Sequence, residues 1–202
     1  MARAGDGWLI VIGLLLLAAS GGRTPGEPAR ARDVATYGEG WVWPLPRLAD
    51  GRPPRRTSGF GGWRTTPTPH VHVGIDVMYE REHRLPAGTK LPVPDHGSIA
   101  SDLPDGTQVL AARAGEVWST GQTNRGQHVV LDHGAPWSTF YQHLSAVYVR
   151  KGDRVEAGQP LGEAGFDPSG KEKVRHLHFE LRDGKVSIDP EPMLTTAEMV
   201  EG

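Results

Sequence analysis

The sequence contains no cysteine among its 202 residues. This absence excludes disulfide bonds, thiolate metal ligands, a cysteine nucleophile and a lipid-modified N-terminal cysteine. An excess of positive charge is also missing, because 22 Lys and Arg face 24 Asp and Glu for a formal net charge of −2. Such a balance does little to neutralise a phosphate backbone, so nucleic-acid binding is not expected.

Helical periodicity is scarce after the first 20 residues, whereas 27 glycines and 17 prolines supply many turns. Hydrophobic residues make up 37% of the chain, which is enough to bury a core. Short apolar runs bounded by turn residues predict a mainly β domain. The expected strands lie at 116–120, 127–133, 138–143, 147–149, 176–182 and 185–188, with an Asp183-Gly184 hairpin turn before the last.

The N-terminus holds one nearly unbroken apolar run at 8–19 (WLIVIGLLLLAA). The run is shorter than the roughly 20 residues that cross a bilayer as a helix. The run ends in small residues, Ala18 and Ala19, and Ser20 comes next, as expected before a signal-peptide cleavage site. We therefore expect a signal peptide at 1–20 and export to the periplasm or the extracellular cell envelope. The alternative is an uncleaved anchor, which would be the chain's only membrane contact.

Composition divides the rest of the chain. Residues 21–40 are rich in Gly, Pro, Arg and Ala and predict a linker, and 41–194 form the expected domain. Within it, 78–105 contains several prolines and little periodicity, which indicates an insertion loop. Loops of that length are often functional, although an insertion without a role is equally compatible. Residues 195–202 are expected to be a C-terminal tail.

Nine histidines are present, and several fall in clusters. In extended backbone, residues two apart point to the same face, so His72 and Asp76 share a face with Gly74 between them, leaving room for a metal. His143 ends an apolar strand. His176 and His178 again share one face, while Leu177 and Phe179 between and beyond them point to the core.

Zinc hydrolase sites use three protein ligands from His and Asp or Glu and keep a fourth position for water. The clusters can supply such a set, with imidazoles left over for proton transfer. Spacing alone does not decide whether His70 or His72 binds, nor which of His176 and His178 does. The plainer alternative is that each pair consists of exposed strand histidines.

A series of motifs in a fixed order adds a family resemblance. These are 57–64 (TSGFGGWR), 72–76 (HVGID), 106–111 (GTQVLA), 115–117 (GEV), 132–134 (DHG), 139–144 (TFYQHL), the glycine-punctuated 152–162 and 176–180 (HLHFE). From about Trp43 to Leu194, the chain resembles the lysostaphin- and LytM-type zinc metallopeptidases, which cut peptide bonds in bacterial peptidoglycan. The extra glycine in Gly61-Gly62 and the long 78–105 segment depart from the family pattern and bear on specificity.

The resemblance implies a fold, a cofactor and residue roles. The fold would be an antiparallel β-sheet of the barrel-sandwich-hybrid type, in a single catalytic domain with long loops. His72, Asp76 and His178 would bind Zn²⁺, and His143 and His176 would be non-ligand imidazoles beside the zinc-bound water. That water would be the nucleophile on stem or cross-bridge peptides, and no H-E-x-x-H glutamate is present to act as its base.

Two other functions stay open. One is a non-catalytic envelope regulator or peptidoglycan-binding module of the same fold, and the other is a metallopeptidase that acts on other proteins. Among the remaining residues, His133 is expected to structure a turn. Trp63 and Trp118 belong either to the core, as is usual in small β domains, or to a substrate groove.

Overall fold

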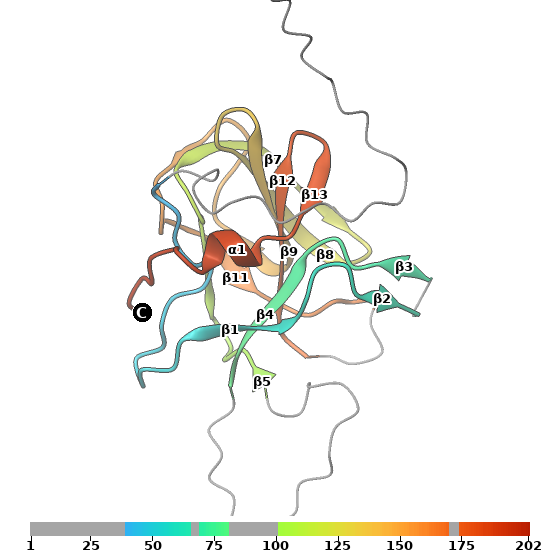
Figure 1. Ribbon diagram of the computed structural model, residues 1–202. Helices are drawn as coiled ribbons and strands as arrows, with labels where there is room; N and C mark the ends of the chain where they lie inside the picture. The colour runs from blue at the N-terminus through green and yellow to red at the C-terminus, as the bar shows by residue number, and fades with distance from the viewer. Residues whose placement is uncertain (1–38, 66–68, 81–100, 170–173) are drawn as a thin grey trace, which may run out of the picture.

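The computed structural model describes residues 39–65, 69–80, 101–169 and 174–202, and these form an almost entirely antiparallel β structure with one short helix (Figure 1). The elements are β1 (Pro54–Ser58), β2 (Trp63–Arg64), β3 (His70–Val71), β4 (Ile75–Glu80), β5 (Ser101–Asp102), β6 (Gln108–Leu110), β7 (Gly115–Thr123), β8 (Gly126–Asp132), β9 (Trp137–Val147), β10 (Arg154–Val155), β11 (Pro160–Ala164), β12 (Leu177–Asp183), β13 (Val186–Ile188) and α1 (Glu191–Leu194). The expected mainly β, antiparallel fold is confirmed.

Strand β12 lies in the middle of the main sheet. The sheet has eleven strands, and its main path runs β1-β4-β12-β9-β8-β7-β10. The register places His178 of β12 opposite Asp76 on β4 and opposite Gln142 on β9. Strands β2 and β3 form a separate two-stranded hairpin that extends to one side of the sheet in Figure 1. Residues far apart in the sequence therefore meet along β12.

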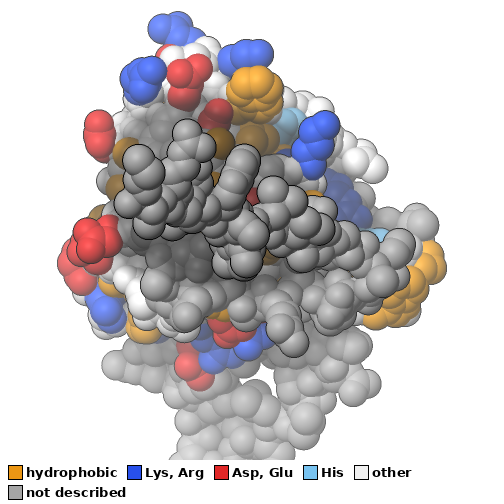
Figure 2. All heavy atoms as spheres, turned by 45° about the horizontal axis from the view of Figure 1, so that its top comes forward, with side chains coloured by type: hydrophobic (Ala, Val, Ile, Leu, Met, Phe, Trp, Pro, Cys, Tyr) orange, Lys and Arg blue, Asp and Glu red, His pale blue; other side chains and the backbone are white. Residues whose placement is uncertain are grey.

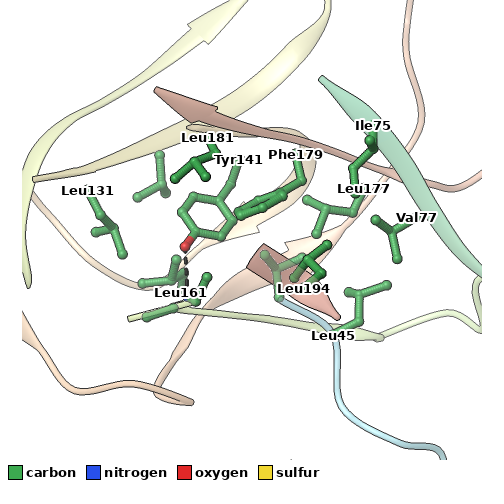
Figure 3. Close-up of a cluster of buried hydrophobic side chains, with 14 of the residues drawn as sticks. Leu45, Ile75, Val77, Leu131, Tyr141, Leu161, Leu177, Phe179, Leu181 and Leu194 are labelled. Atoms are coloured by element: carbon green, nitrogen blue, oxygen red, sulfur yellow. Dashed lines mark hydrogen bonds between the residues drawn. The ribbon is translucent and has the colours of Figure 1, made fainter. Parts of the chain in front are cut away.

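The core lies against one face of β12. Leu177, Phe179 and Leu181 alternate along the strand, are fully or almost fully buried, and pack with Tyr141 of β9 (Figure 3). Leu194 from α1 lies in the same cluster. Burying each large apolar side chain contributes about 1.5–3 kcal/mol, so β12 is held firmly from this side while its other face is left for polar residues.

Most strands expected from the sequence are present. The runs at 116–120, 127–133, 138–143 and 176–182 correspond to β7, β8, β9 and β12, and the final hairpin pairs Asp183 with Val186 around Gly184 at φ 60°. A separate strand at 147–149 is wrong, because β9 simply continues through Val147. Strands β1, β4, β6 and β11 and the two-residue strands β2, β3, β5 and β10 were not expected. Most of them are short, and β1 (PRRTS) has no apolar alternation.

Several predicted segments fall partly or wholly outside the described residues. The signal peptide at 1–20 and linker residues 21–38 lie outside them, as do 81–100 of the expected insertion. The described ends of that insertion are ordered: β5 pairs with the end of β4, and Leu103 is buried. The expected tail at 195–202 pairs in parallel with the domain's first residues through bridges Val42–Glu198 and Arg47–Glu201.

Charge on the surface is mixed. On the face shown in Figure 2, acidic and basic side chains are interspersed around the rim. That distribution agrees with the small net charge of −2. In the part of the chain that the structure describes, no helix has the length and apolar character needed to cross a membrane.

Candidate metal centre

His72 and Asp76 are brought to the sheet by the turn from β3 into β4. Two backbone hydrogen bonds of 2.8 Å tie His72 to the loop before β2, from Gly61 N–H to its carbonyl and from its own N–H to Gly62. Gly74 lies between the two side chains. A Cβ at Gly74 would lie 2.5 Å from the Phe179 carbonyl oxygen and 2.9 Å from the His178 ring. The space beside Gly74 was expected to admit a metal. It is instead filled by β12, whose backbone and His178 ring could not come this close to a residue with a side chain.

Three polar atoms converge where this turn meets β12. His72 Nε2 lies 3.1 Å from Asp76 Oδ1 and 3.0 Å from His178 Nδ1, and the remaining His178–Asp76 separation is 3.2 Å. Both histidines are buried. The structure therefore brings together His72 rather than His70, and His178 rather than His176, which spacing alone had left open.

The hydrogen bonds on the far side of each ring show which nitrogen is protonated. His72 Nδ1 lies 2.8 Å from the Gly59 carbonyl, and His178 Nε2 lies 3.3 Å from a Glu180 carboxylate oxygen. Because both partners can only accept, each of these nitrogens donates, and the opposite nitrogen presents a lone pair. When both rings are neutral, His72 Nε2, His178 Nδ1 and Asp76 Oδ1 are thus three acceptors in mutual contact, an arrangement that a proton or a metal cation between them relieves.

The donor set fits a tetrahedral zinc ion. Ligand atoms 2.0–2.2 Å from a tetrahedral ion lie roughly 3.4 Å from one another, close to the 3.0–3.2 Å found here. Two imidazoles and one carboxylate are also a ligand set that zinc accepts in catalytic sites. Within the described residues, this trio is the group whose ligand atoms lie close enough to hold an ion.

The electrostatics of the trio favour positive charge. Burial disfavours the Asp76 carboxylate, but contacts with His178 and His72 outweigh it and hold the pKa of Asp76 well below its usual value. Burial likewise disfavours a charged His178, yet hydrogen bonds to Asp76 and Glu180 prevail and raise the pKa of His178. A site that attracts a proton in this way also attracts a metal cation.

Arg64 holds the second oxygen of Asp76. Its Nη2 donates its two hydrogens to Asp76 Oδ2 at 2.7 Å and to Ser58 Oγ at 2.6 Å. The same atom lies 3.2 Å from His72 Nδ1, farther than the Gly59 carbonyl at 2.8 Å, and has no third hydrogen to give it. With Oδ2 engaged, Asp76 is left with Oδ1 for the trio. Sequence reasoning assigned no role to Arg64 or to Glu180. Both residues stand inside the quoted motifs. Their contacts, however, depend on the pairing of β2 with β3 and of β12 with β13, which the motifs do not reveal.

His143 and His176 lie beside the trio as a second pair. Their ring centroids are 4.5 Å apart, and His176 Nε2 is 4.0 Å from Asp76 Oδ1. Each donates Nδ1–H to a backbone carbonyl, His143 to Arg125 at 2.7 Å and His176 to Val174 at 3.0 Å. Their Nε2 atoms therefore remain available as acceptors. Burial, aided by the nearby His176 ring, lowers the pKa of His143 to about 4.

A β-bulge directs His143 to this place. Across β8 and β9, Gln127 pairs with Leu144 and His128 with Gln142, so His143 is the extra residue. Its backbone lies in the left-handed region at φ 67°, which is uncommon for a residue other than glycine. Bulges of this kind re-aim a side chain out of the regular alternation. Here the re-aimed ring faces His176.

His133 belongs to a separate network, which runs from its half-buried ring to the buried side chains of Thr139 and Tyr141. Its Nδ1–H donates to the Ala114 carbonyl at 3.0 Å, and its Nε2 lies 2.8 Å from the Thr139 hydroxyl. Thr139 in turn meets the Tyr141 hydroxyl, which accepts from the Ala112 N–H. Burial lowers the pKa of His133 to about 4. These contacts join the β8–β9 turn to neighbouring segments, in agreement with the structural role expected for His133.

The other singled-out residues lie elsewhere. His70 is on β3 and His128 on β8, outside the trio, while His83 and His96 fall outside the described residues. The core alternative for the tryptophans is wrong, because 66% of Trp63 and 60% of Trp118 are exposed. Trp63 pairs with Val71, and its neighbour Arg64 reaches Asp76, so alternation turns Trp63 away from the trio.

Comparison with known proteins agrees with this architecture. Residues 94–190 match the family model described as Peptidase family M23, a span that includes His143, His176 and His178 but begins after His72 and Asp76. This part of the chain, just under half of its length, is therefore similar to the domain of peptidase family M23. Within that class, it is 37% identical over 99 residues to the peptidoglycan DD-endopeptidase ShyA of Vibrio cholerae, an alignment covering 48% of this chain and 22% of ShyA.

The other similar proteins include one named as a sporulation protein and one named as a peptidase. Stage II sporulation protein Q of Bacillus subtilis is 37% identical over 65 residues, covering 32% of this chain and 23% of that protein. The catalytic domain of lysostaphin from Staphylococcus simulans has the same fold, with a TM-score of 0.53 at 24% identity over 70% of this chain and 92% of that domain. The matched part of the chain thus spans less than a quarter of the length of ShyA and of stage II sporulation protein Q.

Proposed function

We propose that the protein is an exported zinc metalloendopeptidase that hydrolyses peptide bonds in peptidoglycan stem or cross-bridge peptides. The observation that supports this most directly is the contact of three acceptor atoms from His72, Asp76 and His178. The match to the M23 family supports the peptidase class. Peptidoglycan as substrate is supported by the names of relatives, a peptidoglycan DD-endopeptidase and a glycyl-glycine endopeptidase among them.

His72 Nε2, Asp76 Oδ1 and His178 Nδ1 would be the protein ligands. Zinc, when bound, would lower the pKa of a coordinated water to roughly 7 and polarise the peptide carbonyl. Arg64 would keep the Asp76 carboxylate oriented through Oδ2. The buried rings of His72 and His178 would exclude bulk water from the back of the site, which strengthens every charge interaction within it.

His143 and His176 would move the proton. Both imidazoles present Nε2, since Nδ1 is engaged by a backbone carbonyl in each case. Burial favours the neutral form of His143, which is the form that accepts a proton from the attacking water. The pair would return that proton to the departing amine, and an imidazolium beside Asp76 would help to stabilise the negative charge that develops on the carbonyl oxygen.

A second candidate is a non-catalytic regulator or peptidoglycan-binding module. It is favoured by the likeness to stage II sporulation protein Q, whose structure with SpoIIIAH is described as a pore-forming complex and matches this fold with a TM-score of 0.57. That match has 21% identity and therefore speaks for the fold alone. Export, in either case, is supported by the apolar segment at 8–19.

The test is digestion of purified peptidoglycan by the chain without residues 1–20. Zinc content is measured first, and released muropeptides are then identified by mass spectrometry, with and without a chelator. We expect one zinc per chain and soluble peptides that disappear with the chelator and return with added zinc. Binding to peptidoglycan without release of peptides would favour the module. Cleavage of a glycine-rich protein but not of peptidoglycan would favour a protein substrate.

A further inference from the structure

A buried carboxylate lies directly behind the candidate metal centre. Glu180 stands two residues after His178 on β12 and is only 4% exposed. One of its oxygens, Oε1, lies 3.3 Å from His178 Nε2. The other, Oε2, accepts hydrogen bonds of 2.9 Å from Arg182 Nε and from Ser187 Oγ. Burying a carboxylate costs free energy unless it is paired. Glu180 has three partners for its two oxygens, so the fold maintains a buried charge at this position, and its purpose is the question.

The β12–β13 hairpin builds the surroundings of Glu180. Arg182 on β12 is the direct partner of Ser187 on β13, and both reach the same oxygen from the hairpin side. The guanidinium of Arg182 also lies 4.7 Å above the Phe140 ring, which fixes its position. The carboxylate is therefore held from two sides before it meets the histidine.

We propose that Glu180 is a positioning residue that sets the tautomer and ring orientation of His178 for metal binding. Because a carboxylate can only accept, it requires the proton of His178 on Nε2 and leaves the lone pair of Nδ1 directed at His72 and Asp76. Carboxylates that back a metal-binding imidazole in this way raise its affinity for the ion. This inference rests on the proposed metal site and adds the residues that prepare it.

Replacing Glu180 with glutamine tests the carboxylate specifically. Glutamine offers one acceptor oxygen, whereas Arg182 Nε and His178 Nε2 both need an acceptor. If the oxygen turns to Arg182, the amide nitrogen faces His178 and favours the opposite tautomer, with the proton on Nδ1 where the metal should bind. Glu180→Gln should therefore weaken zinc binding about 10–100-fold. Ser187→Ala removes one support and should weaken it less than tenfold.

The experiment measures two properties of the full chain and its variants. Zinc affinity is obtained by competition with a chromophoric chelator. The tautomer of each neutral imidazole is read from ring ¹⁵N chemical shifts in metal-free protein at alkaline pH. We expect His178 to be protonated on Nε2 in the wild type and to lose that preference in Glu180→Gln. His72, held by the Gly59 carbonyl, serves as an internal reference and should stay protonated on Nδ1.

Two matched controls and the melting temperature of metal-free protein separate positioning from simple loss of structure. Glu116→Gln removes a carboxylate whose partner is Arg154, and Ser138→Ala removes a hydroxyl on the strand next to β12. Both should keep wild-type zinc affinity. The proposal is overturned if Glu180→Gln keeps both the Nε2–H tautomer and its zinc affinity within twofold.

Two further outcomes are equally decisive. If Glu180→Gln does not fold, Ser187→Ala decides: a zinc affinity equal to that of the wild type would contradict the proposal. If the wild type binds no zinc but its His178 tautomer depends on Glu180, the positioning role stands and the proposed metal function fails.

Discussion

The trio of His72, Asp76 and His178 and the network around His133 both join histidine rings to polar partners, yet their hydrogen bonding is opposite. In the His133 network each contact includes a group that can donate: the Thr139 hydroxyl beside His133 Nε2, the Thr139 hydroxyl again beside Tyr141, and the Ala112 N–H that reaches Tyr141. In the trio, three acceptors face one another. Both groups contain histidine, so it is the mismatch of donors and acceptors that distinguishes a candidate cation site from a structural network.

The protonation behaviour of the two clusters differs as well. Burial lowers the pKa of His133 to about 4, and the nearby Arg113 guanidinium adds to the shift. The pKa of His178 is raised despite burial, because Asp76 and Glu180 stabilise the added charge. The first cluster therefore rejects a cation under conditions in which the second attracts one.

The sharpest way to break the comparison is to remove a member of the trio. His72→Ala should abolish both stoichiometric zinc binding and peptidoglycan cleavage, since it removes one of three protein ligands. Metal analysis and muropeptide release measure the two effects. His70→Ala, two residues earlier on β3, is the control and should keep both. Zinc retained at wild-type affinity in His72→Ala would show that the trio is not the metal site.

A change at His143 should separate binding from chemistry. His143→Ala leaves the trio intact, so we expect full zinc content with a cleavage rate reduced by about 10²–10⁴-fold, as for the loss of a proton-transfer group. His128→Ala, on the adjacent strand, should cleave at close to the wild-type rate. Full activity in His143→Ala would contradict the proton-transfer role.

The smallest effect concerns stability alone. His133 has a folded-state pKa of about 4, below the 6.5 of an unfolded histidine. The unfolded chain therefore binds the extra proton first, and the contribution of His133 is complete above pH 6.5 and is lost as pH falls toward 4. The loss should reach about 3 kcal/mol. Urea unfolding of metal-free protein between pH 4 and 7.5 should show a shallower pH dependence in His133→Gln than in His70→Gln. Equal slopes would mean that His133 is not held neutral by the fold.

Much of the architecture was predictable because its signals are local. Alternating apolar residues and Asp183-Gly184 located β7, β8, β9, β12 and the final hairpin. The short strand β1 and strand β4, interrupted by Gly74 on its approach, were missed because their stability comes from pairing across the sheet rather than from their own pattern. Long-range register is a property that local periodicity does not contain.

The candidate site shows the same division. Spacing identified the histidine pairs and Asp76, and the family resemblance selected among them. The roles of Arg64 and Glu180 depend on a side hairpin and on the pairing of Arg182 with Ser187, which no sequence motif displays. The role of Gly74 was misjudged for a similar reason, since the group that needs its space comes from β12, about 100 residues later.

The left-handed backbone of His143 has a consequence for engineering. At φ 67° a residue with a Cβ loses roughly 1–2 kcal/mol relative to glycine, and asparagine also tolerates this region. Histidine at position 143 therefore lowers the stability of the fold, while its imidazole serves the site. Selection of this chain for heat resistance alone would reward variants that lose the ring. Any engineering of its stability should therefore measure the proposed cleavage and the melting temperature together.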